Sequence, residues 1–182
     1  GQFLLFKREA YESIGGHHAV HEALLEDIAF ARAIHNDGNR VQILFADGML
    51  AVTMYANYQA FKEGWKRIYI EACHRNVKRL RESALISLLF NIGFPVAAIA
   101  GIVVGQLHSP ILFWTSVASL FMYGVNVSWL YKMNHASPLL VLFAPFGGIA
   151  VAGILFGAAH MLTHRIPIKW GGRSYILEPT NK

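Results

Sequence analysis

The sequence predicts a membrane protein in three parts: an α/β segment, an interfacial amphipathic helix, and about three transmembrane α-helices. Of the 182 residues, 54% are hydrophobic and only 15% are charged, whereas a soluble domain usually carries about 25% charged residues. The deficit lies in one stretch. Between Ala84 and Leu162 the only charged residue is Lys132. The composition therefore divides the chain into a polar part and an apolar part.

The polar part begins with residues 1–58, in which short apolar runs alternate with helical patterns. The helix expected over 22–36 has Leu24, Leu25 and Ile28 spaced for one buried stripe, and Asp37-Gly38 follows its end, as glycine commonly does. The order of elements is that of an edge of an α/β domain rather than a complete one. We expect strands over 1–6, 41–45 and 49–55, and helices over 8–14 and 22–36.

Residues 59–82 are predicted to form one amphipathic helix at the membrane surface, because seven basic side chains alternate there with Trp65, Ile68, Tyr69 and Leu80. The net charge of +5 is concentrated in this stretch, and such a stretch suits an anionic cytoplasmic leaflet. Nucleic acid is not expected as a partner, since no nucleic-acid-binding motif accompanies the charge. The basic residues are Lys62, Lys66, Arg67, Arg75, Lys78, Arg79 and Arg81.

The apolar part, 83–164, holds three stretches of the roughly 20 residues that a membrane-spanning helix needs, at about 84–105, 110–131 and 138–162. Three full crossings would put the basic tail, 165–182, on the side opposite the basic helix, against the positive-inside rule. Either the third stretch, which contains Pro145 and Gly147-Gly148, is re-entrant, or the tail is an exception. In this stretch Gly153 and Gly157 have the small-xxx-small spacing that permits close helix contact, although they can also have no packing role.

Glu26 and Asp27 are the first candidates for chemistry. Adjacent residues on a helix point about 100° apart, so one carboxylate can be anchored while the other projects into a cleft. A carboxylate near a helix N-terminus, kept ionised by the helix dipole, can act as a general base. Taken alone, the pair is also what a solvated helix surface contains.

The order of the surrounding motifs resembles the second half of the catalytic domain of family 2 glycosyltransferases, which have a GT-A fold. The resemblance implies that Asp27 is the base that deprotonates the acceptor hydroxyl, with Glu26 as its supporting partner. It also implies that the loop Gly15, Gly16 and His17 shapes the acceptor side of the cleft. The motifs are Gly1-Gln2-Phe3-x-Leu5-x-Lys7-Arg8-Glu9-Ala10-Tyr11-x-x-x-Gly15-Gly16-His17, then Glu26-Asp27, then Gly38.

Two later segments extend the resemblance. Gln59 and the run containing Trp65 and Arg67 are similar, with a different spacing, to a Gln-x-x-Arg-Trp motif that contacts the donor diphosphate and the acceptor. Trp65 can equally be a membrane-interface anchor. The tail Trp170-Gly171-Gly172-Arg173-x-Tyr175 resembles an ending of lipid-, carotenoid- and hopanoid-type members, and is otherwise an ordinary interfacial cluster.

The resemblance implies an inverting transfer of a sugar from a nucleotide-sugar donor to a lipid or lipid-linked acceptor. It implies an integral protein of a bacterial plasma membrane, with the active site facing the cytoplasm. The nucleotide-binding half, with an Asp-x-Asp site for Mg²⁺ or Mn²⁺, is expected upstream of residue 1. No metal is expected to be bound by the present segment.

Two other classes of function remain open. His17, His18, His21 and the pair His160-x-x-x-His164 resemble the His boxes of membrane di-iron desaturases and hydroxylases, since two His four residues apart on a helix can share a metal. A non-enzymatic scaffold or transporter is the other alternative, weakened as a transporter by the lack of ionisable residues in the spans. The single cysteine, Cys73, excludes an internal disulfide.

Overall fold

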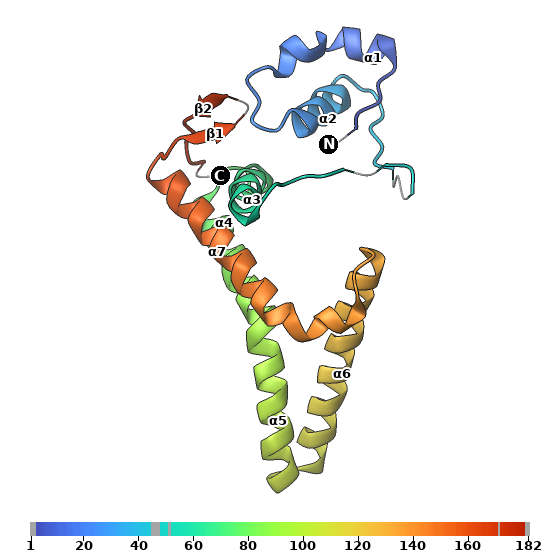
Figure 1. The fold of residues 1–182 in the computed structure, drawn as a ribbon, viewed down its shortest axis with the longest axis vertical. Coiled ribbons are helices and arrows are strands. Elements are labelled where there is room, and N and C mark those ends of the chain that lie inside the picture. The colour runs from blue at the N-terminus through green and yellow to red at the C-terminus, as the bar shows by residue number, and fades with distance from the viewer. Residues whose placement is uncertain (1–2, 45–47, 51, 171, 181–182) are drawn as a thin grey trace.

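A computed structural model describes residues 3–44, 48–50, 52–170 and 172–180, and most of them are helical (Figure 1). A small domain of short helices stands at one end of a long helical hairpin. The elements are α1 Arg8–Ser13, η1 Gly16–Val20, α2 Glu26–Asn36, α3 Tyr58–Ala72, α4 Val77–Leu88, η2 Leu89–Gly93, α5 Phe94–His108, α6 Pro110–Met133, η3 Pro138–Phe143, α7 Ala144–Thr163, β1 Ile168–Trp170 and β2 Arg173–Tyr175.

The hairpin is built from two helices that are long and apolar enough to cross a membrane. The first is continuous from Val77 to His108, through α4, the π-helical turn η2 and α5, and the second is α6. Their close packing depends on small residues, since a β-carbon on Gly105 would meet the backbone of Phe113, and one on Gly101 would meet the hydroxyl of Ser116. The predicted spans 84–105 and 110–131 lie within these two helices.

The third apolar segment, Pro138–Thr163, also has the length and composition of a span, but it does not run the full length of the hairpin. Gly148, in the first part of α7, packs on Asn91, and the Gly148 carbonyl accepts a hydrogen bond from the Ser87 hydroxyl at 3.3 Å. Asn91 lies near the middle of the 32-residue helix Val77–His108. From there α7 returns to the end at which that helix starts, so both ends of the segment lie at the same end of the hairpin (Figure 1). This path corresponds to the re-entrant alternative.

The prediction of one helix over residues 59–82 is wrong. α3 ends at Ala72 with the two hydrogen bonds of a Schellman motif. The Arg75 amide donates to the Ile70 carbonyl at 2.8 Å, and the His74 amide donates to the Glu71 carbonyl at 3.0 Å. His74 and Arg75 adopt left-handed backbone angles, with φ of 54° and 56°.

A new helix then begins beyond this turn. The side chain of Asn76 caps α4 by accepting a hydrogen bond from the Arg79 amide at 2.9 Å. Residues 77–82 are thus the start of the membrane helix. Only α3 remains as a candidate interfacial helix, and Figure 1 shows it nearly end-on while α5 and α6 run along the page.

The three predicted strands are also absent from the described residues of those segments, which are 3–6, 41–44, 49–50 and 52–55. A strand requires a neighbour to pair its backbone groups, and the one sheet among the described residues is the antiparallel pair of β1 and β2 in the tail. Several apolar side chains of the unpaired segments are consequently exposed, such as Leu5 at 85% and Ile43 at 91%. The described residues of 1–58 therefore do not show the α/β character predicted for this part.

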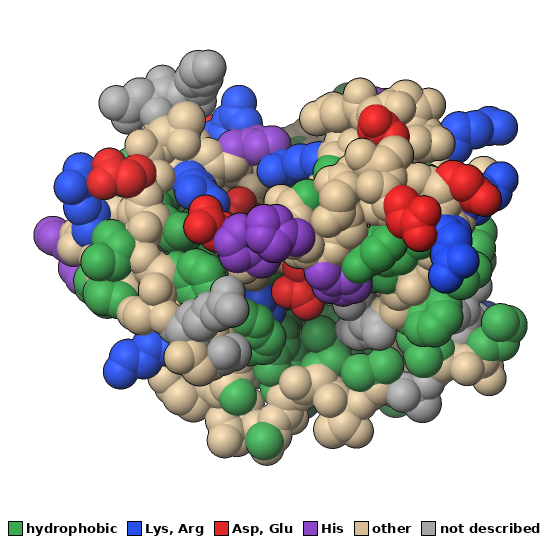
Figure 2. All heavy atoms as spheres, turned by 90° about the horizontal axis from the view of Figure 1, so that it is seen from above, with side chains coloured by type: hydrophobic (Ala, Val, Ile, Leu, Met, Phe, Trp, Pro, Cys, Tyr) green, Lys and Arg blue, Asp and Glu red, His purple; other side chains and the backbone are tan. Residues whose placement is uncertain are grey.

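The junction core is the cluster of buried side chains where α3, α4, α7 and the tail meet. The tail is held there by the buried side chains of Ile168 and Leu177, and by a hydrogen bond from the Thr180 amide to the Arg75 carbonyl at 2.9 Å. Seen from the end that carries α1 and α2, the surface displays acidic, basic and His side chains (Figure 2). The members of the junction core are Leu24, Ile70, Leu80, Ala84, Ala152, Leu155, Ala158, Ala159, Leu162, Ile168 and Leu177.

The re-entrant path of α7 predicts the membrane sidedness of three loops. With Cys73 replaced by Ser, single cysteines at Ser137 and Ser174 should react with a membrane-impermeant maleimide from one side of sealed vesicles. A cysteine at Gln106, at the far end of the hairpin, should react only from the other side. Labelling of positions 137 and 174 from opposite sides would contradict the re-entrant path.

Gly157 of α7 packs against Lys66 of α3, because a β-carbon on Gly157 would lie 3.0 Å from Cε of Lys66. Lys66 cannot easily move, since its ammonium group is 2.8 Å from a carboxylate oxygen of Glu63. We expect Gly157→Leu to lower the free energy of unfolding in detergent by about 1–3 kcal/mol, the usual cost of overpacking. Gly153→Leu is the matched control, since a β-carbon at Gly153 has no neighbour within 4 Å; equal effects of the two variants would contradict this packing.

Candidate active site

The start of α2 carries the two carboxylates singled out in the sequence. Glu26 and Asp27 occupy the first helical turn, directly after the extended residue Leu25, where the helix dipole stabilises negative charge. Asp27 is half-buried and one of its carboxylate oxygens accepts a hydrogen bond from the Ile28 amide at 2.9 Å, whereas Glu26 is exposed. The two side chains therefore have different environments.

Arg67 of α3 connects the start of α2 to the C-terminal hairpin. Its Nη1 donates a hydrogen bond to the Leu24 carbonyl at 3.0 Å, and its guanidinium carbon lies 3.6 Å from the centre of the Trp170 ring in β1. A guanidinium over an indole ring is a favourable cation–π arrangement. Three segments distant in sequence thus meet at one arginine side chain.

The electrostatics of this meeting point include Glu26. Burial of the guanidinium lowers the pKa of Arg67, while Tyr55, Glu26 and Tyr175 act in the opposite direction. Because the ordinary pKa of arginine lies far above physiological pH, the side chain stays charged there. The structure therefore brings Glu26 and Arg67, both predicted site residues, into one electrostatic environment with two residues of the tail, Trp170 and Tyr175.

The loop Gly15-Gly16-His17 is organised around Tyr11. The Tyr11 hydroxyl lies 2.5 Å from Nδ1 of His17 and accepts a hydrogen bond from the His17 amide at 3.0 Å. Gly15 and Gly16 both have positive φ, 81° and 60°, and a β-carbon on Gly16 would lie 2.8 Å from the Tyr11 ring. His17 also contacts Phe30 of α2 edge-on, at 4.9 Å between ring centres, so the loop packs one turn beyond Asp27 on the same helix.

Gln59 and Trp65 do not join Arg67. Gln59 is exposed and donates a hydrogen bond to the Glu63 side chain at 3.2 Å. Trp65 stacks in a row with Phe61 and Tyr69, at 5.9 and 5.3 Å between ring centres. Since residues two apart on a helix point about 200° apart, Trp65 lies on the face of α3 turned away from the Arg67 cluster. This arrangement corresponds to the anchor interpretation of Trp65 rather than to a ligand of the cleft.

Trp170 lies in the candidate site, although the chemistry of its side chain alone did not predict a role there. The signal available for it was the tail motif with its Gly171-Gly172 pair, since Gly-Gly is a favoured turn of a two-stranded hairpin. In the structure Gly172 has a φ of 74°, and the hairpin places Trp170 over Arg67. The tail is thereby a part of the candidate site and not only a basic appendage.

The histidines do not support the desaturase-like alternative. Among the described residues, no group of three or more His, Cys, Asp or Glu side chains is arranged to hold a metal ion. His18 and His21 stack on each other in the N-terminal domain, and His160 and His164 pair at the end of α7. Mg²⁺ or Mn²⁺ prefers about six oxygen ligands, and Glu26 and Asp27 beside a guanidinium group do not fit that requirement.

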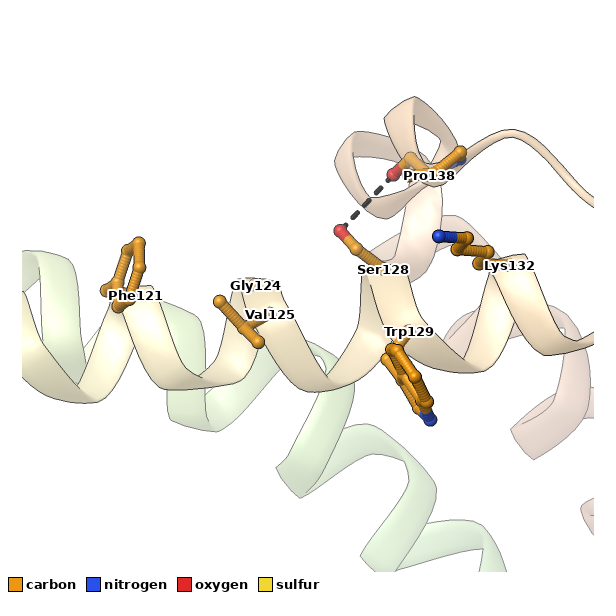
Figure 3. Close-up of a pocket in the computed structure, with 7 residues that line it drawn as sticks. All are labelled: Phe121, Gly124, Val125, Ser128, Trp129, Lys132 and Pro138. Atoms are coloured by element: carbon orange, nitrogen blue, oxygen red, sulfur yellow. Dashed lines mark hydrogen bonds between the residues drawn. The ribbon is translucent and has the colours of Figure 1, made fainter.

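A separate hollow lies on α6, in the membrane part of the chain (Figure 3). Its volume is about 410 Å³, and in its lining the Ser128 hydroxyl donates a hydrogen bond to the Pro138 carbonyl at 3.4 Å. Its apolar surface with a single cation suits a lipid chain better than a sugar nucleotide, so we do not place the active site there. It is lined by Phe121, Gly124, Val125, Ser128, Trp129, Lys132 and Pro138.

The candidate site thus consists of two carboxylates at the start of α2 and the nearby Arg67, at one end of a hairpin of membrane-type helices. The family model described as Glycosyl transferase family 21 matches residues 1–181, and the chain belongs to this family. It is therefore a glycosyltransferase, as the resemblance implied. Searches of curated proteins and of solved structures give no match to the chain.

The glycine loop generates a prediction that separates backbone strain from steric overlap. Gly16→Ala should combine the left-handed penalty of about 1–2 kcal/mol with displacement of the Tyr11 ring, and should lower the free energy of unfolding by more than Gly38→Ala. Gly38 has a φ of 83°, but a β-carbon there would have no atom within 4 Å, so its variant carries the backbone penalty alone. Chemical denaturation of both variants measures the difference, and equal losses would show that Tyr11 does not constrain the loop.

Proposed function

We propose that this chain is the acceptor-side, membrane-anchored part of an inverting glycosyltransferase that moves a sugar from a nucleotide-sugar donor to a lipid or lipid-linked hydroxyl. The observation that carries the proposal is the first turn of α2, where Asp27 follows Glu26 and Glu26 interacts with Arg67, at the end of a membrane-type helical hairpin in a chain of glycosyltransferase family 21. In this proposal, Asp27 is the general base and Glu26 is its supporting partner.

The chemistry assigned to Asp27 is a single displacement. Its carboxylate accepts the proton of the acceptor hydroxyl while the oxygen forms a bond to the anomeric carbon of the sugar. The bond from that carbon to the nucleotide diphosphate breaks, and the diphosphate leaves with the electron pair, so the configuration at the anomeric carbon inverts. The half-buried position of Asp27 in the first turn of α2 supports this role, because the helix start favours the ionised form before the acceptor binds.

The nucleotide-sugar site belongs, in this proposal, to a preceding GT-A half with the Asp-x-Asp motif and its Mg²⁺ or Mn²⁺ ion. The exposed apolar side chains of the extended segments 3–5 and 41–44 support it, since Leu5, Ile43 and Leu44 are at least 80% exposed. Side chains of this kind are normally buried by neighbouring strands. No residue of the present chain is assigned to the metal.

A lipid acceptor and a cytoplasmic active site agree with the distribution of charge. The re-entrant path of α7 puts the basic residues of α3, α4 and the tail at one end of the hairpin, while the link at the other end, residues 106–109, has no Lys or Arg. Cytoplasmic loops carry the excess of Lys and Arg. The aromatic row of α3, which faces away from the Arg67 cluster, is suited to the headgroup layer, where an amphiphilic acceptor presents its hydroxyl.

The test is Asp27→Asn in the intact enzyme. Turnover should fall by about 10²–10⁴, the scale for losing a general base, while the affinity for the nucleotide sugar is retained. Asp37→Asn is the matched control, because Asp37 stands at the other end of α2 and its carboxylate binds the side chains of Ser13 and Asn39. Near-normal turnover of Asp27→Asn would refute the assignment of the base.

A further inference from the structure

The interactions of the Arg67 guanidinium group are with the protein interior. Its Nη1 is bound to the Leu24 carbonyl, and its flat face lies on Trp170. Its Nε is completely buried and has no hydrogen-bond partner among the described residues. A phosphate usually pairs with arginine through two parallel N–H groups, and the side-on pair of Nε with an Nη is closed to a ligand here.

The residue held by Arg67 stands just before the candidate base. Leu24 is 2% exposed and belongs to the junction core, and it is followed by Leu25, the N-cap of α2, and then by Glu26 and Asp27. The hydrogen bond from Arg67 spans 43 residues of sequence and fixes the point from which α2 starts. A shift of the Leu24 carbonyl therefore carries Asp27 with it.

We propose that Arg67, clamped by Trp170, is a positioning residue that fixes Asp27 relative to the membrane anchor and does not bind the donor diphosphate. The proposal rests on Asp27 being the base, as argued above. The tail, α3 and α2 are then linked by successive contacts. Trp170 of β1 packs on the guanidinium plane of Arg67, and the guanidinium binds the Leu24 carbonyl. Leu24 in turn fixes the start of α2. A displacement of about 1 Å at a reacting group can cost about 10²-fold in rate, so a loosened clamp affects turnover more than donor affinity.

The experiment compares Arg67→Lys and Trp170→Leu in the intact enzyme. We expect kcat to fall by about 10- to 100-fold in each, with the affinity for the nucleotide sugar, measured by equilibrium binding, unchanged within about twofold. Trp170→Phe, which retains an aromatic face, should recover part of the loss of Trp170→Leu. The double variant Arg67→Lys/Trp170→Leu should be no worse than the less active single variant, because the two residues act as a unit. Trp114→Leu, at an exposed tryptophan of α6, is the control for loss of an indole.

A second readout does not depend on catalysis. Hydrogen exchange of the Ala29 and Phe30 amides of α2, which are not bound to the Asp27 side chain, should be faster in Arg67→Lys and Trp170→Leu than in the parent protein, and unchanged in Asp27→Asn. If Asp27→Asn retained turnover, the proposed base would fail, and the exchange data would still decide whether the clamp exists. A tenfold or greater loss of donor affinity in Arg67→Lys with unchanged exchange in α2 would overturn the proposal in favour of direct diphosphate contact. Unchanged kcat together with unchanged exchange would overturn it as well.

Discussion

Ile70, Leu80 and Leu162 come from three different helices, yet each is almost completely buried in the junction core. Burying one such side chain stabilises a protein by about 1.5–3 kcal/mol, and few other places in the described part of the chain have a comparable apolar core. The direction of α3 across the hairpin, the return of α7 and the docking of the tail all depend on this contact. Because Leu24 is part of the same cluster, the candidate active site is attached to it as well.

The sequence predicted the elements whose signal is strong and local. The two full spans and the helix of the Glu26-Asp27 pair follow from long apolar runs and from a stripe of apolar residues. The break after Ala72 was not predictable in the same way, because no Gly or Pro marks it. The helix ends through left-handed residues His74 and Arg75, with only Asn76 as a capping signal for the next helix. The basic residues were thus assigned to one surface helix when they belong to two helices.

The packing partners of the glycines were likewise not predictable from the sequence. The spacing Gly153-xxx-Gly157 predicts a helix face without bulky side chains, but it does not predict which other segment packs on that face. In the structure Gly157 receives the aliphatic part of Lys66 from α3, while Gly153 has no close neighbour. The strands expected in residues 1–58 failed for a related reason, since a strand depends on partners that its own residues do not specify. At the site, Glu26 and Arg67 were found by resemblance. Their connection through Leu24 and Trp170 depends on tertiary packing between segments far apart in sequence.

The return of α7 to the end at which the first helix begins has a consequence for biosynthesis. Ile168, Trp170 and Leu177 follow the last apolar segment, so the cell synthesises them after both long helices. Until then α3 lacks part of its packing surface, and the arginine beside the carboxylates lacks its aromatic cover. The chain therefore completes the surroundings of its carboxylates only after all of its apolar segments have been synthesised.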